Sequence, residues 1–181
     1  MTCNVIAAIA KAQPGIEKYL KLMEQLNTTN VAEDAAFQRA YNGFYRVRQR
    51  SGSWYETYYS VMEGAKGKQP TFAETLDQIH TLTGRYEPSF SSKLVATLNP
   101  HLPVWDVHVL RNLGVKPPNY DHPARLARLK ECYGRIESWY QDFLVSDEGH
   151  EWVNTFNEQV ADHPKLTDLK KIDFILWQTR D

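Results

Sequence analysis

Residues 98–114 of the chain read LNPHLPVWDVHVLRNLG and hold two prolines, one aspartate and one glycine in an order that fixes the local fold. Asn99-Pro100 ends the preceding helix, because the residue before a proline is pushed out of the α region. Asp106 stands directly before an apolar helical run, where aspartate is a favoured N-cap, and Gly114 is a favoured terminator. The stretch predicts a proline-braced link that brings one carboxylate to the start of a short helix.

Apolar side chains recur at spacings of three and four on both sides of this link, as in amphipathic helices, and no alternating strand pattern is present. A capping-box pattern at Thr71 and Glu74 starts one helix, and Gly84 follows its expected end. The other expected helices cover about 16–26, 37–47, 54–64, 88–98, 126–143, 152–156 and 169–176. We therefore expect an all-α fold, a compact multi-helix bundle of about nine or ten helices.

The length of 181 residues and a hydrophobic content of 42% suit one globular domain, residues 1–181, or two lobes with a cleft near residues 84–114. Cys3 and Cys132 match no ligand spacing, which favours a reducing compartment and no metal or cofactor. His101, Asp106 and His108 also lack the spacing of a metal site. The apolar run over residues 5–10 is too short to span a membrane, so we expect a cytoplasmic protein without membrane contact.

The net charge of −1 disfavours nucleic-acid binding through overall electrostatics, but the charges are unevenly distributed. Residues 39–50 carry four arginines and no acid, whereas residues 137–163 carry seven acids and no lysine or arginine. The chain is therefore expected to have a basic face. Aromatic residues interleave with the arginines over residues 41–59, and this segment is either a stacking platform for nucleic acid or, as we favour, part of the core.

The segment from Val104 to Arg111 resembles the one that holds the catalytic aspartate in the helix-hairpin-helix DNA glycosylase superfamily. In its endonuclease III-like members the pattern is roughly apolar-Asp-Thr-His-apolar-apolar-Arg. Asp106, His108 and Arg111 fit this pattern, and Val107 takes the place of the threonine. The helix from Phe90 to Leu98 stands where that family has the second helix of its hairpin, so the resemblance covers residues 84–114.

The resemblance implies a protein that acts on or binds DNA, with Asp106 as the catalytic carboxylate beside the sugar of the target nucleotide. Cleavage of an N-glycosidic bond builds positive charge on the sugar, which a fixed carboxylate stabilises. Lys93 is the candidate for the Schiff-base lysine of members that also have lyase activity. The remaining candidates are substrate-binding: Tyr86 and Trp105 as walls of a base pocket, Ser89 and Ser92 as phosphate contacts, and His108 and Arg111 as family positions.

The hairpin departs from the family pattern. Residues 83–90 keep only one glycine of the phosphate-clamping turn, and Glu87 brings a negative charge to it. Lys93 also lies closer to Asp106 in sequence than the lyase lysine of the family does. Two hypotheses therefore stand, a DNA N-glycosylase and a non-catalytic binding or regulatory module on the same scaffold. In the second, Asp106 is only a helix cap; neither hypothesis identifies a protein partner.

Overall fold

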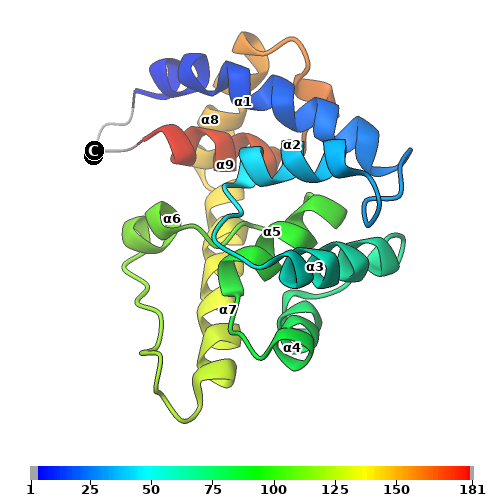
Figure 1. Ribbon diagram of the computed structural model, residues 1–181. Helices are drawn as coiled ribbons and strands as arrows, with labels where there is room; N and C mark the ends of the chain where they lie inside the picture. The colour runs from blue at the N-terminus through cyan, green and yellow to red at the C-terminus, as the bar shows by residue number, and fades with distance from the viewer. Residues whose placement is uncertain (1–3, 180–181) are drawn as a thin grey trace. The chain divides into compact units, whose positions relative to one another are not determined.

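The computed structural model describes residues 4–179, apart from the side chains of His108 and Asn112, as helices joined by loops (Figure 1). The elements are α1 (Val5–Leu26), α2 (Ala35–Tyr45), α3 (Gly52–Ala65), α4 (Phe72–Thr83), α5 (Pro88–Leu98), α6 (Val107–Asn112), α7 (Arg125–Leu144), α8 (Asp147–Gln159), the 3₁₀ turn η1 (His163–Lys165) and α9 (Asp168–Gln178). No strand occurs within residues 4–179, so the expected all-α class is confirmed.

The capping residues that the sequence predicts are found at the ends of α4 and α6. Thr71 accepts the N–H of Glu74, and the Glu74 side chain accepts the N–H of Thr71, which completes a capping box at α4. Gly84 ends the helix in the left-handed region at φ 68°. Gly114 takes φ 62° beyond α6, where the N–H of Val115 donates to the carbonyl of Leu110.

The chain divides into two compact units, which share helix α1. Unit 1 comprises Met1–Ile16 and Pro100–Asp181, and unit 2 comprises Glu17–Asn99. The chain therefore leaves unit 1 within α1 and returns to it at the Asn99-Pro100 step, where α5 ends. No described helix is both long and apolar enough to cross a membrane.

Unit 2 is built around aromatic side chains from α2 and α3. Tyr41, Tyr58 and Tyr59 are at most 1% exposed. Their hydroxyls are hydrogen-bonded: those of Tyr41 and Tyr58 lie 2.8 Å apart, and that of Tyr59 donates to Asn42 Oδ1 at 2.8 Å. The favoured interpretation of residues 41–59 as core is therefore confirmed for most of these rings, because burying them removes large apolar areas from water while their hydroxyls stay paired.

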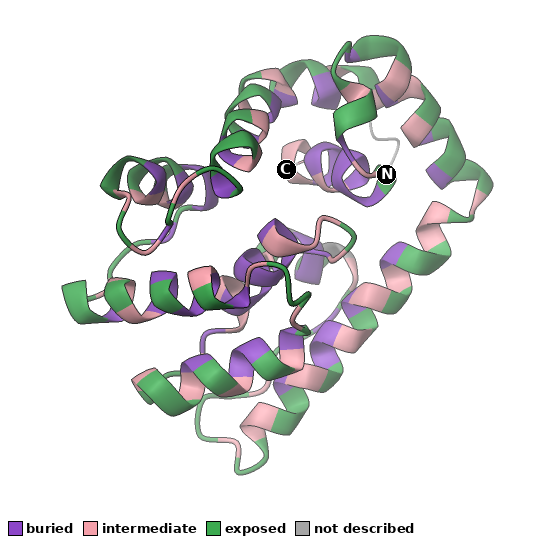
Figure 2. Ribbon diagram, turned by 90° about the vertical axis from the view of Figure 1, so that its right-hand side faces the viewer, coloured by how far each residue is buried: buried purple, intermediate pink, exposed green. Residues whose placement is uncertain are grey.

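Unit 1 is organised around α9, whose residues Ile172, Ile175 and Phe174 are at most 2% exposed. Helices α6, α7 and α8 all contact α9. Figure 2 shows this C-terminal helix as largely buried. Two lysines are buried with it, and each is paired: Nζ of Lys170 lies 2.7 Å from Asp173, and Nζ of Lys171 lies 2.7 Å from Asp168. A buried ammonium is tolerated only with such a partner.

Candidate functional site

The link before Asp106 is anchored at two carbonyl groups within unit 1. The hydroxyl of Thr167 donates to the carbonyl of Pro100 at 2.7 Å, and the hydroxyl of Tyr133 donates to that of Pro103 at 2.8 Å. Thr167 is also the N-cap of α9, since its hydroxyl accepts the N–H of Lys170. Proline has no backbone N–H, so the two prolines reduce the number of donors in this link. The two hydroxyls supply hydrogen bonds to its carbonyl groups. The link is therefore held to α7 and α9.

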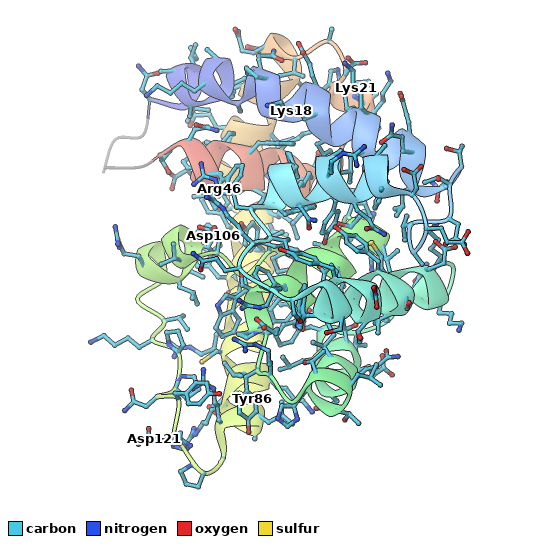
Figure 3. The ribbon with its side chains drawn as sticks, viewed as in Figure 1. Lys18, Lys21, Arg46, Tyr86, Asp106 and Asp121 are labelled. Atoms are coloured by element: carbon cyan, nitrogen blue, oxygen red, sulfur yellow. The ribbon has the colours of Figure 1, made fainter. Side chains whose placement is uncertain are left out.

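Asp106 follows this link as a half-buried residue directly before α6. Its backbone carbonyl accepts the N–H of Leu110 at 3.0 Å, which places it at the N-cap position. Its carboxylate accepts a long hydrogen bond from Nε1 of Trp177, at 3.4 Å from Oδ2. The carboxylate is thus oriented by a donor from α9, and Figure 3 marks the position of Asp106.

A polar cluster of α7 and α9 lies within electrostatic reach of Asp106. The Tyr140 hydroxyl donates to Asp173 Oδ1 at 3.3 Å, and Lys170 Nζ donates to Asp173 Oδ2 at 2.7 Å. Burial raises the pKa of Tyr140 well above its usual value, and the charges of Asp173 and Asp106 raise it further. Tyr140 therefore remains a neutral donor, and Lys170 supplies the positive charge of the cluster.

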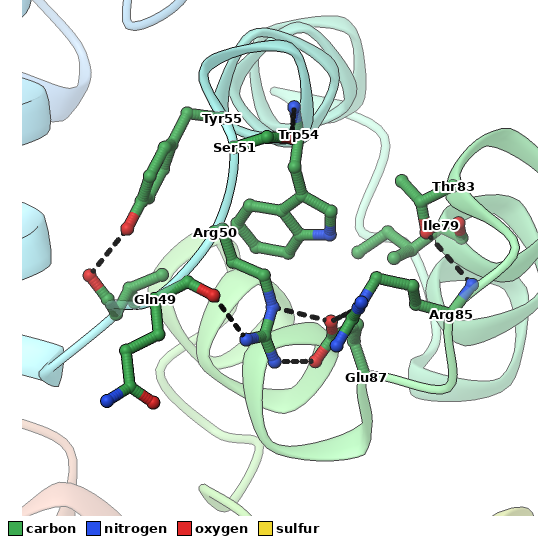
Figure 4. A network of polar contacts seen from close by, with 10 residues as sticks. Gln49, Arg50, Ser51, Trp54, Tyr55, Ile79, Thr83, Arg85 and Glu87 are labelled. Carbon is green, nitrogen blue, oxygen red and sulfur yellow. Dashed lines mark hydrogen bonds and ion pairs between the residues drawn. The ribbon is translucent and has the colours of Figure 1, made fainter.

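The turn between α4 and α5 belongs to unit 2 and is dominated by Glu87, which is 5% exposed. Arg50 donates two hydrogen bonds to its carboxylate, from Nε at 2.7 Å and from Nη2 at 2.9 Å. Nε of Arg85 adds a third bond at 3.0 Å, as Figure 4 shows. Glu87 thus brings a negative charge to this turn, as expected, and two guanidinium groups neutralise it.

Lys93 lies on α5 in unit 2 and is 9% exposed. Its Nζ donates to Ser89 Oγ at 3.0 Å and lies 5.2 Å from the ring centroid of Phe90. Ser92 is fully buried, and its hydroxyl donates to the carbonyl of Ser89 at 2.9 Å. Both Lys93 and Ser92 therefore have partners within their own helix.

The remaining candidates differ in exposure. Tyr86 stacks on His80 with ring centroids 4.4 Å apart, whereas Trp105 is 5% exposed and forms part of the core of unit 1. Arg111 is exposed at the end of α6. The side chain of His108 lies outside the described part of the structure. The candidates divide between the two units. Unit 2 contains Tyr86, Ser89, Ser92 and Lys93, and unit 1 contains Trp105, Asp106, His108 and Arg111.

Several residues that shape these places were not found from the sequence. Trp177 lies 71 positions after Asp106, and Arg50 lies 37 positions before Glu87. No local spacing links such pairs, since only folding brings them together. In the described residues no group of three or more His, Cys, Asp or Glu side chains is placed to hold a metal ion.

Comparison with known protein families, with curated proteins and with solved structures finds no match for this chain.

Proposed function

We propose that the protein is a DNA glycosylase-like enzyme in which the carboxylate of Asp106 does the central chemistry. The observation that carries this proposal is the placement of Asp106. It follows a link anchored at Pro100 and Pro103, and the indole N–H of Trp177 holds its carboxylate in a half-buried position. A carboxylate fixed in this way is preorganised to face developing positive charge. The resemblance of residues 104–111 to the glycosylase motif suggests that this charge is the one that develops on the sugar during cleavage of the N-glycosidic bond.

In the reaction the N-glycosidic bond breaks, and its electron pair leaves with the base, which takes up a proton. Positive charge then develops at the anomeric carbon, where the Asp106 carboxylate stabilises it. Water adds to this carbon and loses a proton, which leaves an abasic site. The lyase activity that the resemblance implies would use the amine of Lys93 as its nucleophile, and this amine donates a hydrogen bond to Ser89 Oγ.

The test is base release from duplex oligonucleotides that each carry one damaged or deaminated base. We expect release from at least one of them, and a loss of about 100-fold or more in rate with Asp106→Asn, because the charge is removed and the shape is kept. Asp121→Asn is the matched control, since Asp121 is an exposed aspartate of a loop in the same unit. Borohydride trapping of the wild type and of Lys93→Gln tests the lyase step.

A non-catalytic binding module is the second candidate, and the occupied turn favours it. Arg50 and Arg85 are engaged with Glu87, and Lys93 is engaged with Ser89, so these groups already have protein partners. If no base is released from any substrate, no DNA binds at low salt and Asp106→Ala mainly lowers the melting temperature, the results support this second function. Base release that is lost in Asp106→Asn would contradict this second candidate.

A further inference from the structure

Unit 2 contains a polar hollow that lies apart from Asp106. It has a volume of about 460 Å³ and lies between the first turns of α3 and the end of α4. The side chains that matter for its chemistry are Arg50, Ser51, Ser53, Trp54, Thr83 and Arg85. The volume lies within the range of about 300–1,000 Å³ that is usual for small-ligand sites. The hollow therefore has room for a charged group and the atoms attached to it.

Trp54 contributes a buried donor that has no acceptor. It is 4% exposed, and its Nε1 has no hydrogen-bond partner within the described residues. Figure 4 shows this nitrogen on the ring edge turned toward Ile79 and Arg85. An unpaired buried N–H costs free energy, which a ligand with an accepting oxygen would recover. The indole thus points to an acceptor rather than to an apolar guest.

Arg85 contributes a positive charge that is only partly used. Its Nε donates to Glu87, but among residues 4–179 no acceptor is found for its terminal nitrogens, and its side chain is 57% exposed. Arg50 is bonded to the same carboxylate. Two guanidinium groups share one carboxylate, so a net positive charge remains at the hollow. The terminal N–H groups of Arg85 are arranged in one plane, which suits the binding of an oxyanion.

The first turn of α3 adds backbone donors at the same place. The hydroxyl of Ser51 accepts the N–H of Trp54 at 3.3 Å, and the N–H groups of Gly52 and Ser53 have no acceptor in the part of the chain that the structure describes. The first N–H groups of a helix and its dipole favour a negative charge. The backbone and the two side chains therefore select the same kind of ligand.

We propose that this hollow binds the phosphate group of a phosphorylated ligand, with Trp54 Nε1 and the terminal nitrogens of Arg85 as donors. The phosphate comes either from a nucleic-acid backbone or from a small phosphate ester, and the two sources share this chemistry. The site does not involve Asp106, so it stands independently of the proposed base release.

The test follows the indole N–H signals of the full-length, ¹⁵N-labelled protein during titration with sodium phosphate, with sodium chloride keeping the ionic strength constant. The chain has five tryptophans, and Trp54→Phe identifies the signal of Trp54. We expect this signal to move saturably as its proton gains an acceptor. Arg85→Gln should raise the Kd about tenfold or more, the loss expected for a charge-assisted bond.

Arg128→Gln is the control, because its side chain is 56% exposed and also pairs with one glutamate, Glu131, outside unit 2. It should leave the Kd unchanged, and Asp106→Asn should do the same. Competition by a DNA duplex would assign the phosphate to a nucleic-acid backbone, and competition by a nucleoside monophosphate alone would assign it to a small ester. The proposal is overturned if phosphate causes no saturable shift, or if Arg85→Gln binds phosphate as well as the wild type.

Discussion

The carboxylate of Glu87 holds the turn before α5 through its pairing with Arg50 and Arg85. Glu87→Gln removes the charge and leaves Arg50, whose side chain is 18% exposed, without its ionic partner. Breaking a buried ion pair from one side costs about 3–5 kcal/mol, so we expect Glu87→Gln to lower the free energy of unfolding by about 3 kcal/mol in urea denaturation. Glu131→Gln removes an exposed pair and should change it by less than about 1 kcal/mol. Equal effects of the two substitutions would show that the buried pair does not support the turn.

Two glycines of neighbouring helices in unit 1 have opposite roles. A Cβ added to Gly149 in α8 would overlap the carbonyl oxygen of Phe143 and lie 2.8 Å from its carbonyl carbon. A Cβ on Gly134 in α7 would meet nothing within 4 Å. We expect Gly149→Ala to lower the free energy of unfolding by about 1–3 kcal/mol through overpacking. Gly134→Ala should raise it by about 0.5–1 kcal/mol, because alanine favours a helix more than glycine does. Thermal unfolding of the two variants decides the matter, and a stabilising Gly149→Ala would contradict the close approach of α8 to Phe143.

The start of α2 depends on the charge of Asp34. Its carboxylate accepts the N–H groups of Phe37 and Ala36 and the hydroxyl of Thr29. These bonds, first that from Phe37, lower the pKa of Asp34 below its ordinary value of 3.8. The lowered pKa means that the stabilisation is fully present above pH 3.8 and is lost as the pH falls further.

The corresponding variant is Asp34→Asn, which keeps a capping oxygen and removes the charge. The wild type should be more stable than this variant at pH 6, and the difference should shrink when urea denaturation is repeated at pH 3. A difference that stays constant between the two pH values would show that the charge does not contribute to the cap.

The sequence predicted the helices but not the contacts between residues that lie far apart in the chain. The capping box at Thr71 and the terminators Gly84 and Gly114 depend on neighbouring residues, so local pattern was enough to find them. One donor to Asp106 comes from Trp177, 71 positions away, and no period of three or four reaches that far. The boundaries of the two units also could not be read from composition, because α1 runs without interruption from one unit into the other.

Both units bury tyrosines, and this sets the alkaline limit of stability. Burial, above all, raises the pKa of Tyr41 and Tyr58 in unit 2 and of Tyr133 and Tyr140 in unit 1 well above the ordinary value of 10. In the unfolded chain these groups ionise near pH 10, so above that pH the unfolded state loses protons that the folded state keeps, and stability falls as the pH rises. We expect only part of the tyrosine absorbance at 295 nm to titrate near pH 10 and the rest to appear together with the loss of the helical circular dichroism signal. Titration of all ten tyrosines near pH 10 with the helices intact would contradict their burial.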